Sequence, residues 1–130
     1  AYEKELFEKS HYIFNEKILP LVGIMTFKKL DEAIKISQNI ISINGLGHSA
    51  GIYTKNEYDI IKVGLSLNVS RIIVNQPHSQ SAGGNVNNSL NTTLSLGCGT
   101  WGNSIINNNL NYLDFSNKTV ISLKLKKNGN

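Results

Sequence analysis

RIIVNQPHSQSAGGNVNNSLNTTLSLGCGTWGNS, which runs from Arg71 to Ser104, is the most informative part of this chain. Its first five residues, 71–75, are rich in β-branched side chains and predict a buried strand. Residues 76–96 then read as a polar loop that ends at the glycine-rich segment 97–102. Loops of this length are uncommon in compact domains unless they have a function, and glycine lets backbone approach backbone or a ligand where a Cβ atom would clash. We therefore expect a strand that leads into a functional loop.

Two helices and two further strands are predicted upstream of this stretch. The apolar run 18–27 and the segment 50–54 have the length and composition of strands. Apolar residues recur at helical spacing after residue 30 and again after residue 56. The expected inward faces are Ala33, Ile36, Ile40 and Ile43 in the first helix and Tyr58, Ile61, Leu65 and Leu67 in the second. The order β-α-β-α-β predicts a mostly parallel α/β sheet.

Residues with known capping preferences mark the ends of these helices. Asp31 is the expected N-cap of the first helix and Asn56 that of the second, because their side-chain oxygens can accept bonds from unpaired backbone N–H groups. Gly45 is expected to end the first helix in the left-handed conformation. Downstream of the loop, residues 107–115 predict a third helix and residues 119–126 a terminal strand.

Composition limits the class of protein. At 130 residues with 40% hydrophobic content, the chain is one globular domain or part of one. No apolar run approaches about 18 residues, so a transmembrane helix is not expected. The single cysteine favours a reducing compartment such as the cytoplasm. The missing initiator Met and the abrupt polar end are typical of a piece of a longer chain, which would leave an apolar patch exposed.

The charge pattern argues against a nucleic-acid partner. The formal net charge is +4, and several of the lysines lie near the end of the chain. There they alternate with apolar residues, as in the solvated face of an edge strand, whereas a nucleic-acid interface requires a basic stripe with interleaved aromatic residues. We interpret the abundance of asparagine as nucleotide bias in the coding genome.

Three residues have both a chemical and a structural interpretation. Glu16 is either a solvated loop carboxylate or an acceptor for sugar hydroxyl groups. His48 is either a catalytic base or a histidine bonded to nearby backbone. Cys98, between two glycines, is either a nucleophile or a small packing residue, and packing is favoured because the sequence shows no base beside it.

Neither a metal centre nor a dinucleotide-binding loop is predicted. His11 and His78 are too scattered for a metal site, and one cysteine adds little to them. The glycine cluster 97–102 lacks the GK[ST] ending of a P-loop and the strand-to-helix context of a GxGxxG motif.

Several segments together resemble the CoA-acylating aldehyde dehydrogenases, which act on acetaldehyde, succinate semialdehyde or sulfoacetaldehyde, or form the aldehyde half of bifunctional aldehyde–alcohol dehydrogenases. The similarity covers nearly the whole chain, in order. Its segments are EKILP (16–20), DEAI (31–34), GLGHSAGIYT (45–54), RIIVNQP (71–77) and LSLGCGTWGNS (94–104). The resemblance implies part of the aldehyde dehydrogenase catalytic domain over residues 1–118, and an oligomerisation strand with its tail over 119–130.

The resemblance also implies roles for individual residues. Glu16 matches the glutamate that holds the nicotinamide ribose, and Ile18 matches a position, often aromatic in relatives, near the nicotinamide ring. The implied lining of the aldehyde or acyl entrance is His48, His78, Ser79, Leu94 and Leu96. Cys98 matches the cysteine of the LGCG segment, not the catalytic cysteine, which the resemblance places upstream of Ala1.

The implied enzyme interconverts an aldehyde plus CoA with an acyl-CoA, using NAD or NADP, and the 130 residues alone are expected to be inactive. Its expected partners are the remainder of its own polypeptide and identical subunits, with no nucleic acid and no membrane. The expected location is the cytoplasm, or a bacterial microcompartment. Two alternatives stay open: a non-acylating, hydrolytic aldehyde dehydrogenase, and a free-standing α/β binding module.

Overall fold

The chain forms a small α/β structure built around two parallel strands. The computed structural model describes residues 18, 20 and 22–124. Its elements follow the order α2 (Leu30–Asn44), β1 (Ser49–Ile52), α3 (Glu57–Ser66), β2 (Arg71–Val74), α4 (His78–Ser81), η2 (Thr100–Gly102) and η3 (Tyr112–Phe115). β1 and β2 pair in parallel, from Ser49 opposite Arg71 to Ile52 opposite Val74. The predicted parallel α/β class is therefore confirmed.

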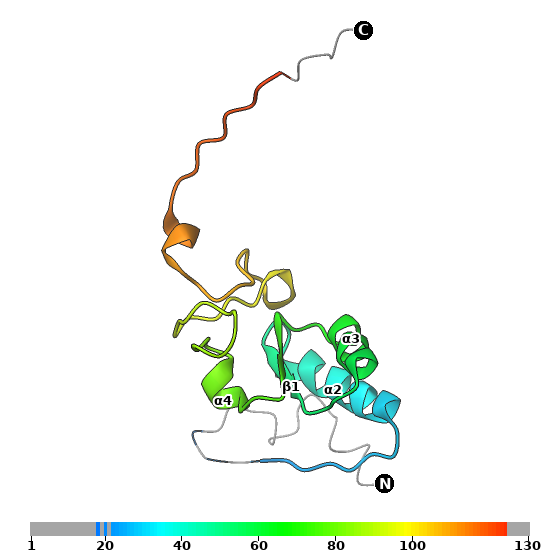
Figure 1. Ribbon diagram of the computed structural model, residues 1–130. Helices are drawn as coiled ribbons and strands as arrows, with labels where there is room; N and C mark the ends of the chain where they lie inside the picture. The colour runs from blue at the N-terminus through cyan, green and yellow to red at the C-terminus, as the bar shows by residue number, and fades with distance from the viewer. Residues whose placement is uncertain (1–17, 19, 21, 125–130) are drawn as a thin grey trace, which may run out of the picture.

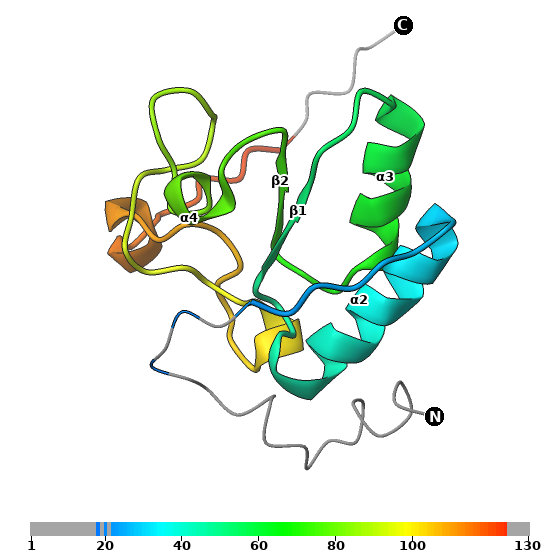
Figure 2. The same ribbon diagram turned by 90° about the horizontal axis from the view of Figure 1, so that it is seen from below.

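The elements are arranged in layers (Figures 1 and 2). α2 and α3 lie together on one side of the strand pair, and α4 with the loop that follows it lies on the other side. The core between the helices and strands contains Ile34 of α2, Val63 of α3 and the α3–β2 connection. Leu67 and Val69 in that connection are 6% and 7% exposed, so the short turn is anchored by its own side chains.

The start of α3 follows the predicted capping chemistry. The Asn56 side chain accepts a hydrogen bond of 3.0 Å from the Tyr58 backbone N–H, which satisfies one of the unpaired donors of the first turn. The N-cap predicted for α2 is wrong. Lys29 occupies its N-cap without a side-chain bond, and Asp31 instead forms an ion pair of 2.5 Å with Lys62 of α3, which raises the pKa of the lysine.

α2 ends at Gly45 as predicted, but the predicted left-handed conformation of this residue is wrong. Gly45 has a φ of −124°, and the left-handed glycine of this turn is Gly47, with a φ of +75°. A helix end followed by several glycines can place the left-handed residue at more than one of them, and the tertiary contact of Gly47 decides the position.

The inward faces of the two helices match the predicted ones only in part. In α3 the buried residue is Val63, whereas Tyr58, Ile61 and Leu65 are exposed, and the predicted Leu67 is buried just after the helix ends. In α2 the buried residue is Ile34, the predicted Ala33, Ile36 and Ile43 are half-buried, and Ile40 is 40% exposed. Helical spacing identifies apolar stripes, but α3 carries more apolar surface than the described residues cover. The apolar patch expected from the sequence stays a prediction.

The strand predicted at 18–27 is not formed by its described residues, which are irregular and exposed. A strand requires a neighbour for its backbone groups, and within the described part of the chain β1 pairs only with β2. The apolar, β-branched composition of this run indicated the type of element without showing that a partner strand is present.

Of the two elements predicted at the C-terminal end, the helix is wrong, and the strand, expected to pair outside the main sheet, stays a prediction. Of the helix predicted at 107–115, only the 3-10 turn η3 is present, where Asn111 and Asp114 form a capping box. Asn109 instead bridges to Leu96 in antiparallel fashion. Residues 119–124 of the strand predicted at 119–126 are exposed and unpaired, and its last two residues lie outside the described part. None of the helices in the part of the chain that the structure describes has the length and apolar character needed to span a bilayer.

Replacing Asn56 by Ala removes the cap of α3 and is expected to lower the free energy of unfolding by about 1 kcal/mol. Urea denaturation followed by circular dichroism measures the change. Asn39→Ala is the matched control, because Asn39 is an exposed residue within α2 and lies at no helix end. Equal stability of the Asn56→Ala chain and the wild type would show that this cap contributes nothing.

Candidate functional site

The chain turns back against β1 directly after β2. α4 places the imidazole of His78 next to β1, where its Nε2 lies 2.8 Å from the Ser49 hydroxyl oxygen. The ring also lies over Gly51, since a Cβ atom at that position would be 3.1 Å from His78 Nδ1. The glycine in β1 therefore leaves the space that the imidazole occupies. Among the residues predicted to line the acyl entrance, His78 is the one whose side chain is hydrogen-bonded to a side chain of the strand pair, that of Ser49.

Asparagine side chains hold the loop that follows β2. Asn75 has a φ of +53°, a conformation that asparagine tolerates better than most residues. Its side chain accepts a bond of 2.9 Å from the Thr54 N–H and donates one of 2.7 Å to the Thr54 carbonyl. Asn88 donates to the Gln76 side chain and the Ser81 carbonyl. The asparagines that we attributed to nucleotide bias thus include structural residues of this loop.

The glycine cluster packs backbone against backbone. The N–H groups of Gly97 and Gly99 donate to the carbonyls of Asn108 and Ile106, at 3.0 and 2.9 Å. A Cβ atom at Gly97 would lie 2.3 Å from the Ile106 oxygen, and one at Gly47 would lie 1.9 Å from the Cys98 oxygen. These glycines are therefore required for the cluster to lie against the α2–β1 turn and the 106–108 segment.

Cys98 lies within this packed region. Its Sγ is 3.9 Å from the Leu96 carbonyl oxygen and 3.6 Å from the position of a Cβ atom built on Gly102. No histidine, lysine or carboxylate is bonded to the sulfur among the described residues. This environment favours a packing role, because no general base is bonded to the thiol among the described residues, and the nearby cation, Arg71, donates to the carbonyl oxygens of Gly97 and Asn107.

The remaining predicted site residues do not converge. His48 and Ser79 are exposed, and Leu94 is fully exposed in the loop. Leu96 is 38% exposed at the bridge to Asn109. Glu16 lies outside the described residues, whereas Ile18 is described and is fully exposed.

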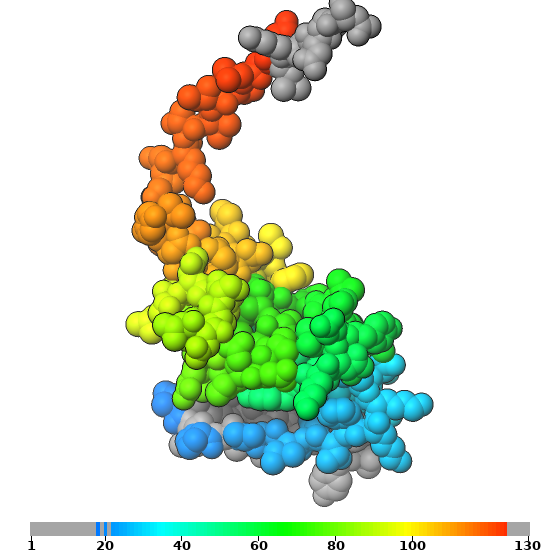
Figure 3. Space-filling view, viewed as in Figure 1, coloured from blue at the N-terminus to red at the C-terminus, as the bar shows by residue number. Residues whose placement is uncertain are grey.

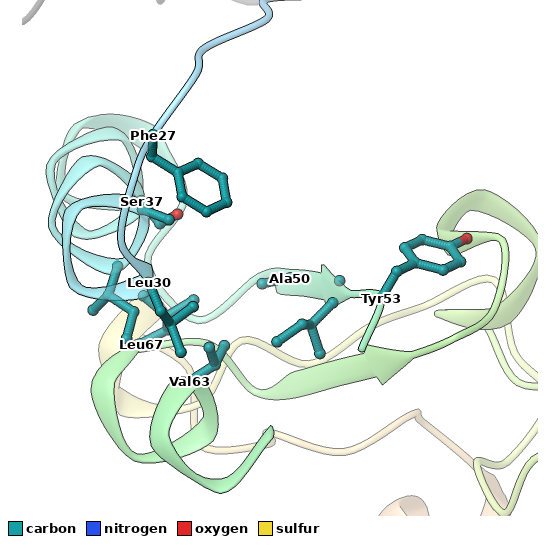
Figure 4. Close-up of a pocket in the computed structure, with 11 residues that line it drawn as sticks. Phe27, Leu30, Ser37, Ala50, Tyr53, Val63 and Leu67 are labelled. Atoms are coloured by element: carbon teal, nitrogen blue, oxygen red, sulfur yellow. The ribbon is translucent and has the colours of Figure 1, made fainter. Parts of the chain in front are cut away.

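An apolar groove of about 300 Å³ opens between α2 and β1 (Figure 4). Phe27, in the segment before α2, and Leu30, the first residue of α2, approach it from one side, while Ala50 and Tyr53 border it from the β1 side. Val63 and Leu67 form its floor against the core. No charged side chain lines this groove, so within the described residues it offers apolar surface and no acid–base chemistry.

Arg71 is a structural residue that the sequence analysis did not single out. It begins β2, is 7% exposed, and donates from Nη2 to the carbonyls of Gly97 at 2.6 Å and Asn107 at 3.2 Å. Desolvation by burial lowers the pKa of its guanidinium and outweighs the opposing Coulombic effect of the nearby Cys98. The sequence did contain a sign of this role, because Arg71 is the one arginine in a chain whose other basic residues of this kind are lysines.

No arrangement of three or more histidine, cysteine, aspartate or glutamate side chains that could hold a metal ion occurs among residues 18, 20 and 22–124.

Comparison with known proteins identifies the family. No protein-family model matches the chain. It is 36% identical to a sulfoacetaldehyde dehydrogenase of an Acholeplasma species, over 92% of this chain and 24% of that protein. It is 40% identical to the succinate-semialdehyde dehydrogenase (acetylating) of Clostridium kluyveri, over 75% of this chain and 21% of that protein. The chain belongs to the acylating aldehyde dehydrogenase family.

Solved structures agree with this membership. A probable aldehyde dehydrogenase from Listeria monocytogenes EGD-e matches with a TM-score of 0.75 and 29% identity, over 85% of this chain and 25% of that one. An acetylating aldehyde dehydrogenase from Geobacillus thermoglucosidasius matches with a TM-score of 0.63 and 28% identity, over 77% and 23%. The resemblance drawn from sequence motifs is therefore confirmed. The chain spans about a quarter of the length of the aldehyde dehydrogenases that it matches.

Gly47→Ala tests the contact between the α2–β1 turn and the glycine cluster. An alanine there combines a left-handed backbone with a Cβ atom that overlaps the Cys98 carbonyl, so we expect a loss of about 2 kcal/mol or more in the free energy of unfolding. Gly64→Ala is the matched control. Gly64 lies within α3 with open space around it, and its replacement should stabilise the chain by about 0.5–1 kcal/mol. Equal effects at both positions, measured by urea denaturation, would contradict the contact.

Proposed function

We propose that this chain forms part of an NAD(P)-dependent, CoA-acylating aldehyde dehydrogenase that interconverts an aldehyde plus CoA with an acyl-CoA. The observation that carries the proposal is the similarity to acylating and acetylating enzymes over most of the chain. In this reaction a cysteine outside these residues forms a thioester with the acyl group, and CoA thiol then takes the acyl group. A bound nicotinamide supplies the hydride acceptor.

The residues present have supporting roles in this proposal. Glu16 accepts hydrogen bonds from the nicotinamide ribose, since an ionised carboxylate is an acceptor only. Ile18 packs near the nicotinamide ring, and its full exposure leaves the side chain available for that contact. His48, His78, Ser79, Leu94 and Leu96 border the acyl entrance, where the bond between His78 and Ser49 fixes the imidazole against β1.

The proposal assigns the nucleophile to a cysteine other than Cys98, so the 130 residues alone are inactive. The packing of Cys98 beside Gly47 and Gly102, without a bonded base among the described residues, supports this assignment. Residues 1–118 then belong to the catalytic domain. The proposed location is the cytoplasm, or a bacterial microcompartment, because a reactive thiolate requires reducing conditions.

The C-terminal segment 119–130 is proposed to join subunits. Residues 116–124 extend away from the body of the chain (Figures 1 and 3). Val120, Ile121 and Leu123 in this segment are 87%, 80% and 82% exposed. An extended segment with unpaired backbone groups and apolar side chains can add itself as a strand to the edge of a neighbouring sheet. Identical subunits are the proposed partners.

Activity measurements on the longer protein test the assignment of roles. Glu16→Gln should raise the KM for the nicotinamide cofactor at least about tenfold, because a charge-assisted hydrogen bond is lost. Cys98→Ala should retain acylation with little change in kcat. Formation of acyl-CoA is followed by cofactor absorbance, with and without CoA.

Three results with the longer protein would overturn the proposal. They are acylation of Cys98 by the aldehyde, unchanged cofactor kinetics in Glu16→Gln, and release of free acid at the same rate whether CoA is present or absent. Catalysis by the 130-residue chain alone would also contradict it.

Val120→Asp combined with Leu123→Asp should lower the oligomeric state of the longer protein, because charged side chains oppose burial of this segment between subunits. Light scattering coupled to size exclusion measures the molar mass. Lys118→Asp is a control that changes charge just before the segment. An unchanged mass in the double variant would exclude the segment from the interface.

A further inference from the structure

β1 has one edge without a partner strand in the described part of the chain. Its other edge pairs with β2, where the Ile52 carbonyl accepts the Asn75 N–H at 2.9 Å. Successive residues of a strand point their backbone groups to opposite edges. The N–H and C=O groups of Gly51, an exposed residue, therefore point away from β2. This second edge, which we call the outer edge of β1, offers unpaired donors and acceptors to another strand.

The apolar groove between α2 and β1 opens at the same edge. Residues 50–53 line it from β1, and Phe27 lines it from the segment before α2 (Figure 4). Side chains alternate between the two faces of a strand. A lining that includes Gly51 as well as Ala50 and Ile52 therefore reaches the backbone of the outer edge. A strand added at this edge would cover the groove with every second side chain.

Residues 22–27, VGIMTF, have the composition of such a strand. Met25 and Phe27 are 42% and 56% exposed, whereas Val22 and Ile24 are 80% and 87% exposed. The two less exposed residues are two positions apart, which is the spacing of one face of a strand. A run that is apolar on both faces is typical of a parallel strand covered on both sides. Here α2 and α3 lie on one side of the strand pair, and α4 lies on the other (Figures 1 and 2).

The handedness of the chain connections selects the outer edge of β1. β1, α3 and β2 form a parallel strand–helix–strand unit, and such crossovers are right-handed in about 98% of cases. α2 lies on the same side of the strand pair as α3. A strand before α2 that keeps the same hand must therefore lie beside β1, on the edge away from β2. Pairing at the far edge of β2 would require a left-handed connection.

We propose that residues 22–27 form a strap that closes onto the outer edge of β1 as a third parallel strand. The structure shows the open position, in which the strap is exposed and Phe27 already lines the groove. In the closed position Met25 and Phe27 cover the groove, and this burial with the new backbone bonds opposes the entropy lost on ordering the strap. The closed strap also protects the edge from pairing with a second copy of the chain.

The face of each strap residue fixes the direction of its N–H group. In β1, Ala50 and Ile52 line the groove, and the Ile52 carbonyl points toward β2. Parallel strands of L-residues in one sheet share this relation between side-chain face and backbone direction. Met25, when it faces the groove, therefore points its N–H group at β1. The N–H group of Ile24 points away from β1.

Proline substitutions in the strap test this geometry. Met25→Pro removes a donor on which the closed strap depends, and Ile24→Pro is the matched control, since it removes a donor that faces away from β1. Hydrogen exchange of the 130-residue chain is followed by NMR. Exchange of the Gly51 N–H should be at least about tenfold faster in Met25→Pro than in the wild type, and less than about threefold faster in Ile24→Pro. The Ile52 N–H, which faces β2, should change little in either variant.

Equal exchange of the Gly51 N–H in the wild type and in Met25→Pro would overturn the proposal, as would equal acceleration by the two proline variants. Dilution separates a strap of the same chain from a strand of a second copy. A strap protects Gly51 equally at all protein concentrations. Protection that falls on dilution would assign the outer edge to a second copy and exclude the strap.

Light scattering coupled to size exclusion tests the protective role of the strap. Met25→Pro leaves the outer edge of β1 free, so its average molar mass should rise with protein concentration more steeply than that of Ile24→Pro. The same molar mass for both variants at every concentration would show that the strap does not protect the edge.

Discussion

The buried guanidinium of Arg71 is the link on which the described fold depends. It joins the first residue of β2 to the carbonyls of Gly97 and Asn107, which belong to segments that follow it by 26 and 36 residues. A sheet of only two strands covers little surface by itself. The return of the glycine cluster to the N-terminal end of the strands closes this end of the structure. Gly47 and Gly97 then allow the backbones to meet without Cβ atoms between them.

The family membership and the strand β2 could both be predicted from the sequence. The first follows from motifs spread along the chain, and the second from a local pattern of residues. The segment 71–75 is apolar, β-branched and bounded by turn residues, and β2 forms there. Asn56 precedes a helical pattern, and its side chain caps α3 as expected. These signals are local. The strand predicted at 18–27 and the helix predicted at 107–115 needed long-range information, since a partner strand or a covering surface decides whether such segments become regular.

The candidate site likewise combines features that the local sequence predicts with contacts that it does not predict. The glycine cluster was predicted to provide close backbone approach, and the approach is to Ile106, Asn108 and Cys98. The convergence of Ser49 with His78 could not be read from positions 29 residues apart. Arg71 and Asn109 were missed because their burial depends on loops that have no regular pattern. Two clues are available in the sequence. One is a single arginine in a chain that otherwise carries lysine, and the other is an asparagine in a segment without helix or strand signals.

The parallel register of β1 and β2 also has a consequence for the order of folding. Ser49 pairs with Arg71 across a separation of 22 residues, and α3 occupies about half of the intervening chain. Closing such a short loop loses little chain entropy. The contact between Gly47 and Cys98 spans 51 residues and orders a long polar loop. Loop-closure entropy therefore favours a nucleus made of β1, α3 and β2, with the glycine cluster docking onto it afterwards.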